Sequence, residues 1–99
     1  MTILYGGVKY FQTRHAIYCK KCQETIESKS QYDFKMCSCN SVGVDGGISG
    51  GRILGKLSDM ESRSMYCAYV NKKKLWLPQE AIEANFNMLK RFEKSLNIT

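Results

Sequence analysis

The stretch that decides the fold is CKKC at residues 19–22, followed after fourteen residues by CSC at residues 37–39. These segments place four of the chain's five cysteines in two close pairs. Two thiolate pairs at the separation that a short β-hairpin spans are typical of two loops converging on one tetrahedral ion. We therefore expect Cys19, Cys22, Cys37 and Cys39 to bind one zinc ion.

This zinc ion would be structural, because four thiolates leave no open position for a catalytic water. A structural zinc contributes about 10–16 kcal/mol of apparent binding energy, against about 5–15 kcal/mol of net stability for an ordinary domain. Folding should therefore depend on the metal. In such thiolate turns the residue after the second cysteine often takes a positive φ, which Asn40 tolerates well and Gln23 less well.

Size and composition indicate one small domain. The chain has 99 residues, and its 15 basic and 9 acidic residues give a net charge of +6. This charge permits contact with nucleic acid or with an acidic protein surface but requires neither. The odd number of cysteines argues against a disulfide framework, and the first residues lack a signal-peptide layout. We expect a soluble protein in the cytoplasm, with its thiols kept reduced for a metal.

The fold class we predict is small α+β, with a zinc-ribbon β-hairpin core, extra short antiparallel strands and one C-terminal amphipathic helix. Residues 15–50 form the zinc-ribbon-like module of this single domain. Residues 25–29 alternate in polarity and should pair with a strand near residues 32–36. Residues 3–11, interrupted by two glycines, predict a bent strand or two short ones.

The region 58–77 should hold a short helical turn and a strand pair. Ser58 and Glu61 fit a capping box, which predicts the start of the turn. Residues 64–70 and 75–77 should pair across a loop at 71–74. Cys67 lies inside this apolar run, where a buried, inert thiol is expected.

The C-terminal residues 78–97 carry the strongest helical pattern, which begins at Pro78. Apolar residues recur there at helical spacing, and basic residues follow near the end. The stripe should pack on its own domain, or else form a homodimer or lie in a partner's groove. Its members are Ile82, Phe86, Leu89, Phe92 and Leu96.

Six glycines fall between residues 43 and 55, which predicts tight turns and little regular structure. Successive backbone N–H groups in such turns can bind an anion. A P-loop ending is missing, so a folded connection is the simpler interpretation. The residues of a possible anion or nucleotide contact are Gly46, Gly47, Gly50, Gly51 and Arg52.

A nucleic-acid-binding module is a further hypothesis. Tyr66, Tyr69 and Trp76 could stack on bases, although aromatic residues in paired strands usually belong to a core. His15 could be a ligand or a base, but a surface or strand-start histidine is the simpler interpretation. The candidate phosphate contacts are Lys20, Lys21, Lys72, Lys73, Lys74, Lys90 and Arg91.

Residues 15–50 resemble a family of short uncharacterised zinc-ribbon-like proteins of bacteriophages and bacterial mobile elements. The resemblance rests on the two cysteine pairs, on Asp33-Phe34 between them and on Val-Asp-Gly-Gly at 44–47. It implies zinc ligation by the four cysteines and a phage or bacterial origin. Asn40 stands where the pattern usually has glycine, and the sequence after Gly47 differs from shorter members.

No catalytic constellation is evident, so an enzyme is the least supported class. The leading hypothesis is a non-enzymatic phage accessory factor that binds and modulates a host protein. The alternatives are a nucleic-acid-binding zinc ribbon and a nucleotide-sequestering protein that uses the glycine-rich segment.

Overall fold

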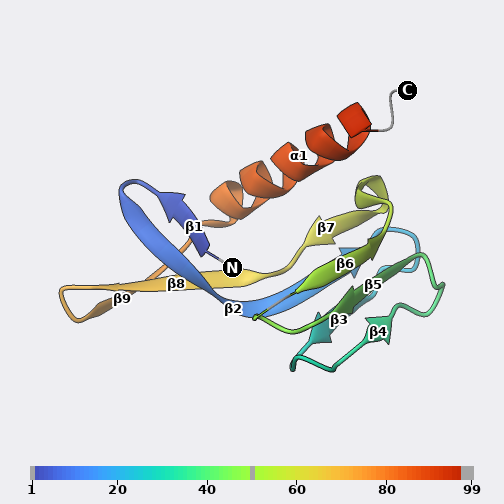
Figure 1. The fold of residues 1–99 in the computed structure, drawn as a ribbon, viewed down its shortest axis with the longest axis horizontal. Coiled ribbons are helices and arrows are strands. Elements are labelled where there is room, and N and C mark those ends of the chain that lie inside the picture. Colours follow the sequence, from blue (N-terminus) through green and yellow to red (C-terminus); the bar gives the residue numbers. More distant parts are fainter. Residues whose placement is uncertain (1, 50, 97–99) are drawn as a thin grey trace.

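The computed structural model describes residues 2–49 and 51–96, with side chains through Met88. Within them the chain is mostly β-strand in two antiparallel sheets, followed by one C-terminal helix, which is compatible with the predicted α+β class (Figure 1). The elements are β1 (Thr2–Tyr5), β2 (Val8–Cys19), β3 (Thr25–Ser28), β4 (Lys35–Met36), β5 (Val42–Asp45), β6 (Arg52–Gly55), the 3-10 turn η1 (Leu57–Asp59), β7 (Met60–Ser62), β8 (Met65–Val70), β9 (Lys73–Trp76) and α1 (Gln79–Leu96).

The larger sheet has the strand order β1-β2-β8-β9, and β3 and β7 also pair with β2. Gly6 and Gly7 have φ values of 58° and 77°, the left-handed conformation that a two-residue hairpin turn requires. They divide the first apolar run into two strands. Asn71 and Lys72 make the same kind of turn, with φ values of 51° and 67°. The predicted pair of strands at 64–77 is therefore present, with a shorter loop than expected.

The long strand β2 changes partners along its length. Phe11 pairs with Cys67 of β8, whereas Ile17 pairs with Ser62 of β7, and the register shifts between Gln12 and Arg14. Buried polar side chains form hydrogen bonds with backbone groups of β2 where the strand pairing is interrupted. Gln12 Nε2 donates to the Arg14 carbonyl at 3.1 Å, and the Ala16 N–H donates to Ser64 Oγ at 3.2 Å.

Two apolar clusters hold the molecule together. The first joins β2, β3 and β7 to the smaller sheet β4-β5-β6 and to α1. The second lies between the larger sheet and the start of α1. Their buried members are Ile17, Cys19, Ile26, Cys37, Val42, Val44, Met60 and Phe86 in the first, and Tyr10, Tyr66, Ala68, Leu77, Ala81 and Ile82 in the second.

The pairing predicted for residues 25–29 is wrong. Strand β3 pairs with β2, so that Ile26 lies opposite Ile17, and β4 pairs with β5. The physical reason is that each cysteine pair closes its own hairpin. The first pair joins β2 to β3, and the second joins β4 to β5. Two hairpins, rather than one, therefore bring the thiols together.

The glycine-rich segment is more regular than predicted. Its ends form β5 and β6, which pair from Val42↔Gly55 to Asp45↔Arg52. Gly47 has a φ of 60°, and a Cβ there would lie 2.8 Å from the Ser30 carbonyl carbon. The turn thus needs glycine for both its conformation and its close approach to the loop after β3.

The predicted capping box is also wrong. The turn η1 begins after Lys56, with no side-chain hydrogen bond at its start, and Glu61 lies in β7. A helical turn is present near this position, but Ser58 lies inside it.

The predicted C-terminal helix is present. Ile82 and Phe86 are buried, as the stripe requires. The side chains of Leu89, Phe92 and Leu96 lie outside the described residues. No helix within the described residues has the length and apolarity needed to cross a bilayer.

Candidate metal centre

Each cysteine pair lies on a turn that is closed by a backbone hydrogen bond and ends at a residue of positive φ. In the first, the Gln23 N–H donates to the Cys19 carbonyl at 2.8 Å, and in the second the Asn40 N–H donates to the Cys37 carbonyl at 2.9 Å. Gln23 and Asn40 have φ values of 59° and 58°. The expected positive φ after each second cysteine is therefore confirmed, even for glutamine, which pays a conformational cost there.

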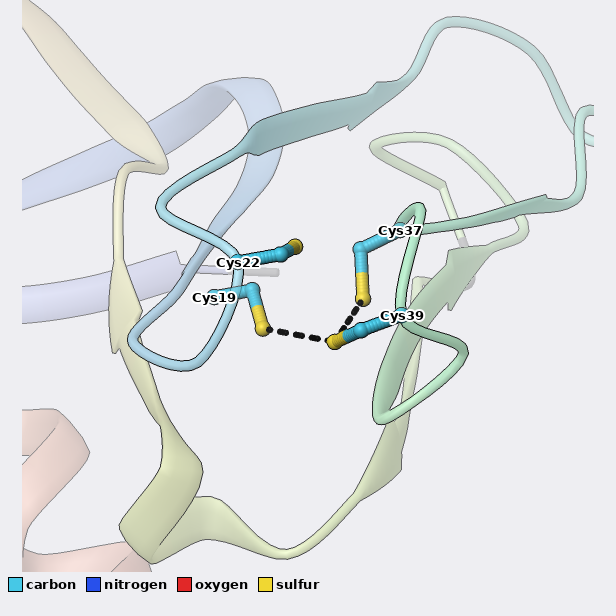
Figure 2. A group of neighbouring side chains, drawn as sticks. All are labelled: Cys19, Cys22, Cys37 and Cys39. Carbon is cyan, nitrogen blue, oxygen red and sulfur yellow. Dashed lines mark hydrogen bonds between the residues drawn. The ribbon is translucent and has the colours of Figure 1, made fainter.

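The four sulfur atoms converge from the two loops, as Figure 2 shows. All four Sγ atoms lie within 4.8 Å of one another, close enough to bind one metal ion. Cys39 Sγ lies 3.6 Å from Cys19 Sγ and 3.5 Å from Cys37 Sγ. These separations are those of four ligands around one ion, and thiolate sulfur is a soft donor suited to transition metals.

The protein environment separates the pKa values of the thiols. The Ser41 hydroxyl and backbone N–H stabilise the Cys39 thiolate and lower the pKa of Cys39 to about 6. For Cys19, the Cys22 backbone N–H lowers the pKa, but burial and hydrogen bonds with neighbouring thiols outweigh it and raise the pKa to about 11. Without a metal, one ligand is thus ready to bind as a thiolate while another holds its proton.

The centre lies at the margin of the first apolar cluster. Cys19 and Cys37 are buried members of that cluster, Cys22 is half-buried against it and Cys39 is exposed. A bound ion would therefore join the core of both sheets on one side and face solvent on the other.

Polar contacts attach the two loops to their neighbours. The Lys20 N–H donates to the Asp59 carbonyl at 2.9 Å, and Lys21 Nζ lies 3.5 Å from Asp59 Oδ2. Ser38 Oγ donates to the Glu24 carboxylate, which links the second loop to the first. The loops are thus held close together by contacts that do not involve sulfur.

Asp33 and Gly47, which belong to the motif quoted above, have structural roles. Asp33 accepts a hydrogen bond from the Lys29 N–H at 2.8 Å, and this bond lowers the pKa of Asp33. Ser28 Oγ donates to the Asp33 carbonyl at 2.6 Å and accepts from the Gly47 N–H at 2.8 Å. Asp33 and Gly47 thus fix the loop after β3 to the turn after β5.

His15 and Cys67 lie outside the sulfur cluster. His15 is buried at 4% exposure inside β2, so the expected surface or strand-start position is wrong, and its Nε2 lies 2.9 Å from the Arg52 carbonyl oxygen. Cys67 is buried in β8, as expected. Neither belongs to the group that could hold a metal among the described residues.

The candidate anion contacts do not gather at one place. Gly46 and Arg52 border a cavity that also includes Asp45, and the Arg52 guanidinium lies 3.6 Å from the Asp45 carboxylate. Gly47 is buried, Gly51 borders a different cavity, and Gly50 lies outside the described residues. The paired carboxylate would compete with an anion for Arg52.

The candidate phosphate contacts are also dispersed. Lys20 and Lys21 follow β2, whereas Lys72–Lys74 lie at the β8–β9 turn, at the opposite end of the long axis (Figure 1). The side chains of Lys90 and Arg91 lie outside the described residues. Tyr66 is buried as core, but Tyr69 and Trp76 are exposed, contrary to the expectation for paired strands.

Sequence reasoning missed Ser41 and Phe11. Ser41 Oγ lies 3.2 Å from Cys39 Sγ and lowers the pKa of Cys39, and its position two residues after that cysteine was an available signal. Phe11 is 55% exposed, next to the buried Tyr10. Strict alternation along residues 8–13 would have placed the two rings on opposite faces.

Comparison with known proteins gives one family. The family model described as Domain of unknown function (DUF7695) matches residues 6–55, a range that contains both cysteine pairs. No curated protein and no solved structure matches the chain. The prediction of an uncharacterised family is thereby confirmed, and the chain belongs to the family Domain of unknown function (DUF7695).

Proposed function

We propose that this protein is a non-enzymatic binding protein whose scaffold is fixed by one structural zinc ion. The observation that supports the proposal best is the convergence of four thiol sulfurs within 4.8 Å. Four cysteines on two turns form a closed ligand set, which is the usual arrangement of a structural zinc in a zinc ribbon. The scaffold would present its surface to a partner, and the metal would take no part in chemistry.

Zinc is proposed over other soft metals because a closed tetrahedral thiolate site gives structural stability without redox change. Iron is the main competitor for four cysteine ligands. Elemental analysis after expression with both metals available should find one zinc per chain. A preparation that holds iron, with the absorption of an iron–thiolate centre, would overturn the zinc assignment.

The partner we propose is a host protein, modulated by an accessory factor from a phage or mobile element. The support is the sequence resemblance of residues 15–50 together with a rigid scaffold. The protein would act in the bacterial cytoplasm, where thiols stay reduced for the metal. Capture from bacterial lysate should recover a stoichiometric protein that resists nuclease treatment. Loss of every partner after nuclease treatment would contradict this proposal.

Nucleic acid is the second candidate partner, and the distribution of charge favours it. Residues 2–19 and 62–78 hold six basic residues and no acidic one. The remaining residues hold nine of each sign, so the whole net charge of +6 arises from these two segments. They form β1, β2, β8 and β9 of the larger sheet. Binding that weakens steeply with salt is the test of this candidate.

A further inference from the structure

The part of the larger sheet formed by β1, β2, β8 and β9 has two different faces. The inner face carries Tyr10, Tyr66 and Ala68, which pack against the start of α1. Because side chains alternate along a strand, the residues between them point to the outer face. Phe11, Cys67 and Trp76 lie opposite one another across three strands, so they share that outer face.

The outer face presents exposed aromatic rings. Phe11 is 55% exposed, Trp76 is 48% exposed and Tyr69, two residues after Cys67, is 71% exposed. Phe11 and Trp76 are separated by β8, which sets their backbones roughly 10 Å apart. Three large rings displayed on one face of a small domain are unusual, because aromatic residues normally contribute to the core.

Each end of this row carries a cation on its ring. Lys9 Nζ lies 5.9 Å from the centroid of the Phe11 ring, and Lys74 Nζ lies 4.3 Å from the centroid of the Trp76 ring. Lys9 and Lys74 belong to the outer face by alternation, each two residues from the ring it covers. With no acidic residue in these strands, the face combines flat aromatic surfaces and uncompensated positive charge.

We propose that this outer face binds single-stranded nucleic acid. Bases would stack on Phe11, Trp76 and Tyr69, and the phosphates would contact Lys9 and Lys74. This inference rests on the second candidate function proposed above, nucleic-acid binding, and names the kind of nucleic acid and the surface that binds it. Stacking and phosphate contact are together what single-strand binding requires, and both features occur on one face here.

A single strand fits this face better than a duplex or an acidic protein. A duplex hides the faces of its bases within the stack, so the three rings would find no partner there. An acidic protein surface would satisfy the lysines but not the flat rings. Unpaired bases offer a ring face to each aromatic side chain, independent of sequence.

The test uses the full, metal-loaded chain and a fluorescently labelled 15-nucleotide oligothymidylate, with a duplex of equal length as comparison. We expect the single strand to raise the anisotropy of the label and to quench the fluorescence of Trp76, the chain's only tryptophan. The logarithm of affinity should fall with the logarithm of salt by about 0.7 per phosphate contact. Absence of binding at low salt, or equal binding of the duplex without quenching, would overturn the inference.

Two exposed tyrosines provide a matched pair of variants. Tyr69→Ala on the outer face should weaken single-strand binding by about 5- to 100-fold, the usual effect of losing one stacked base. Tyr32→Ala should leave affinity unchanged, because Tyr32 is 88% exposed in the loop between β3 and β4. Lys74→Gln should reduce the salt slope by about 0.7. Equal effects of both tyrosine variants would contradict the proposed surface.

Metal analysis of the same preparations separates this inference from the scaffold proposal. A zinc-loaded chain that binds no oligonucleotide overturns the single-strand surface and leaves the structural-zinc proposal intact. A metal-free, folded chain that binds the oligonucleotide overturns the structural-zinc proposal and supports the single-strand surface. Stronger binding to anionic lipid vesicles than to the oligonucleotide also overturns the inference, because charge alone would then explain it.

Discussion

The two halves of this molecule hold their strands together by different means. In the half that contains β3 to β6, short strands of two to four residues surround the four cysteines. In the half formed by β1, β2, β8 and β9, the strands form a continuous sheet that packs one face against α1. A two-residue strand such as β4 has little capacity to bury apolar surface, so a metal ion bound by the four cysteines would fix its position.

The charges of the two halves differ in the same way. All of the net positive charge lies in residues 2–19 and 62–78, which include β1, β2, β8 and β9, whereas the remaining residues are electrically balanced. We propose that the metal-binding half serves stability and that the other half offers a surface for a partner. The long strand β2 belongs to both halves and ends at Cys19, so a metal ion bound there would also order the strand that the two halves share.

The largest effect on metal content and stability should come from replacing one metal ligand. The matched control replaces a buried thiol of the other half. Cys37→Ser should lose metal and lower the melting temperature sharply, since it removes a buried ligand. Cys67→Ser, also at a buried thiol, should keep one metal per chain and cost only about 1–3 kcal/mol. Elemental analysis and thermal melts check both variants. Equal loss of metal from both variants would contradict the division of the molecule into a metal-binding half and a second half.

A smaller effect is expected for glycines in the two halves. Gly47→Ala meets both a positive φ and the Ser30 backbone, so it should cost about 2–4 kcal/mol. Gly7→Ala has a φ of 77° but nothing within 4 Å of the added Cβ, so about 1 kcal/mol is expected. Urea unfolding of the two variants measures the difference. If Gly7→Ala were the more damaging change, close packing of the loops would not explain the need for Gly47.

The smallest effect concerns the pH dependence of the thiols in the interval between removal of the metal by a chelator and loss of the fold. With a pKa of about 6, Cys39 is a thiolate at neutral pH, whereas Cys19, with a pKa of about 11, is a thiol. Cys39 should therefore be alkylated first, and its rate should fall as the pH drops through about 6. Stabilisation of the folded state by this thiolate is present above the ordinary pKa of 9.0 and is lost as the pH falls towards 6.

A hydroxyl-deletion variant gives the control for this pH dependence. Ser41→Ala should raise the pKa of Cys39 towards 9.0, because it removes the hydroxyl that stabilises the thiolate. Alkylation of Cys39 at neutral pH should then become slower, as measured by mass spectrometry of labelled peptides. An unchanged rate would show that the hydroxyl does not set the reactivity of Cys39.

Sequence reasoning succeeded where a chemical constraint acts over a short distance. The cysteine pairs predicted both the sulfur cluster and the positive φ at Asn40 and Gln23. The proline and the apolar spacing that follows it predicted α1. In each case a few neighbouring residues determine the local geometry, so no knowledge of the rest of the fold was needed.

The errors arose where features outside a segment's own sequence pattern decide its pairing or exposure. The alternation of residues 25–29 indicated a strand, but only the closure of the first cysteine turn determines that β2 is its partner. The glycines near residue 47 suggested irregular structure, yet they let β5 and β6 turn sharply and pair. The exposure of Trp76 likewise depends on which face of the larger sheet α1 covers.

The most direct test of the account is native mass spectrometry of the purified chain, combined with alkylation of its thiols. The account predicts one zinc ion per folded chain, with the four clustered cysteines protected until a chelator removes the metal and the fold is lost. A metal-free chain that unfolds cooperatively while its thiols are freely alkylated would contradict it.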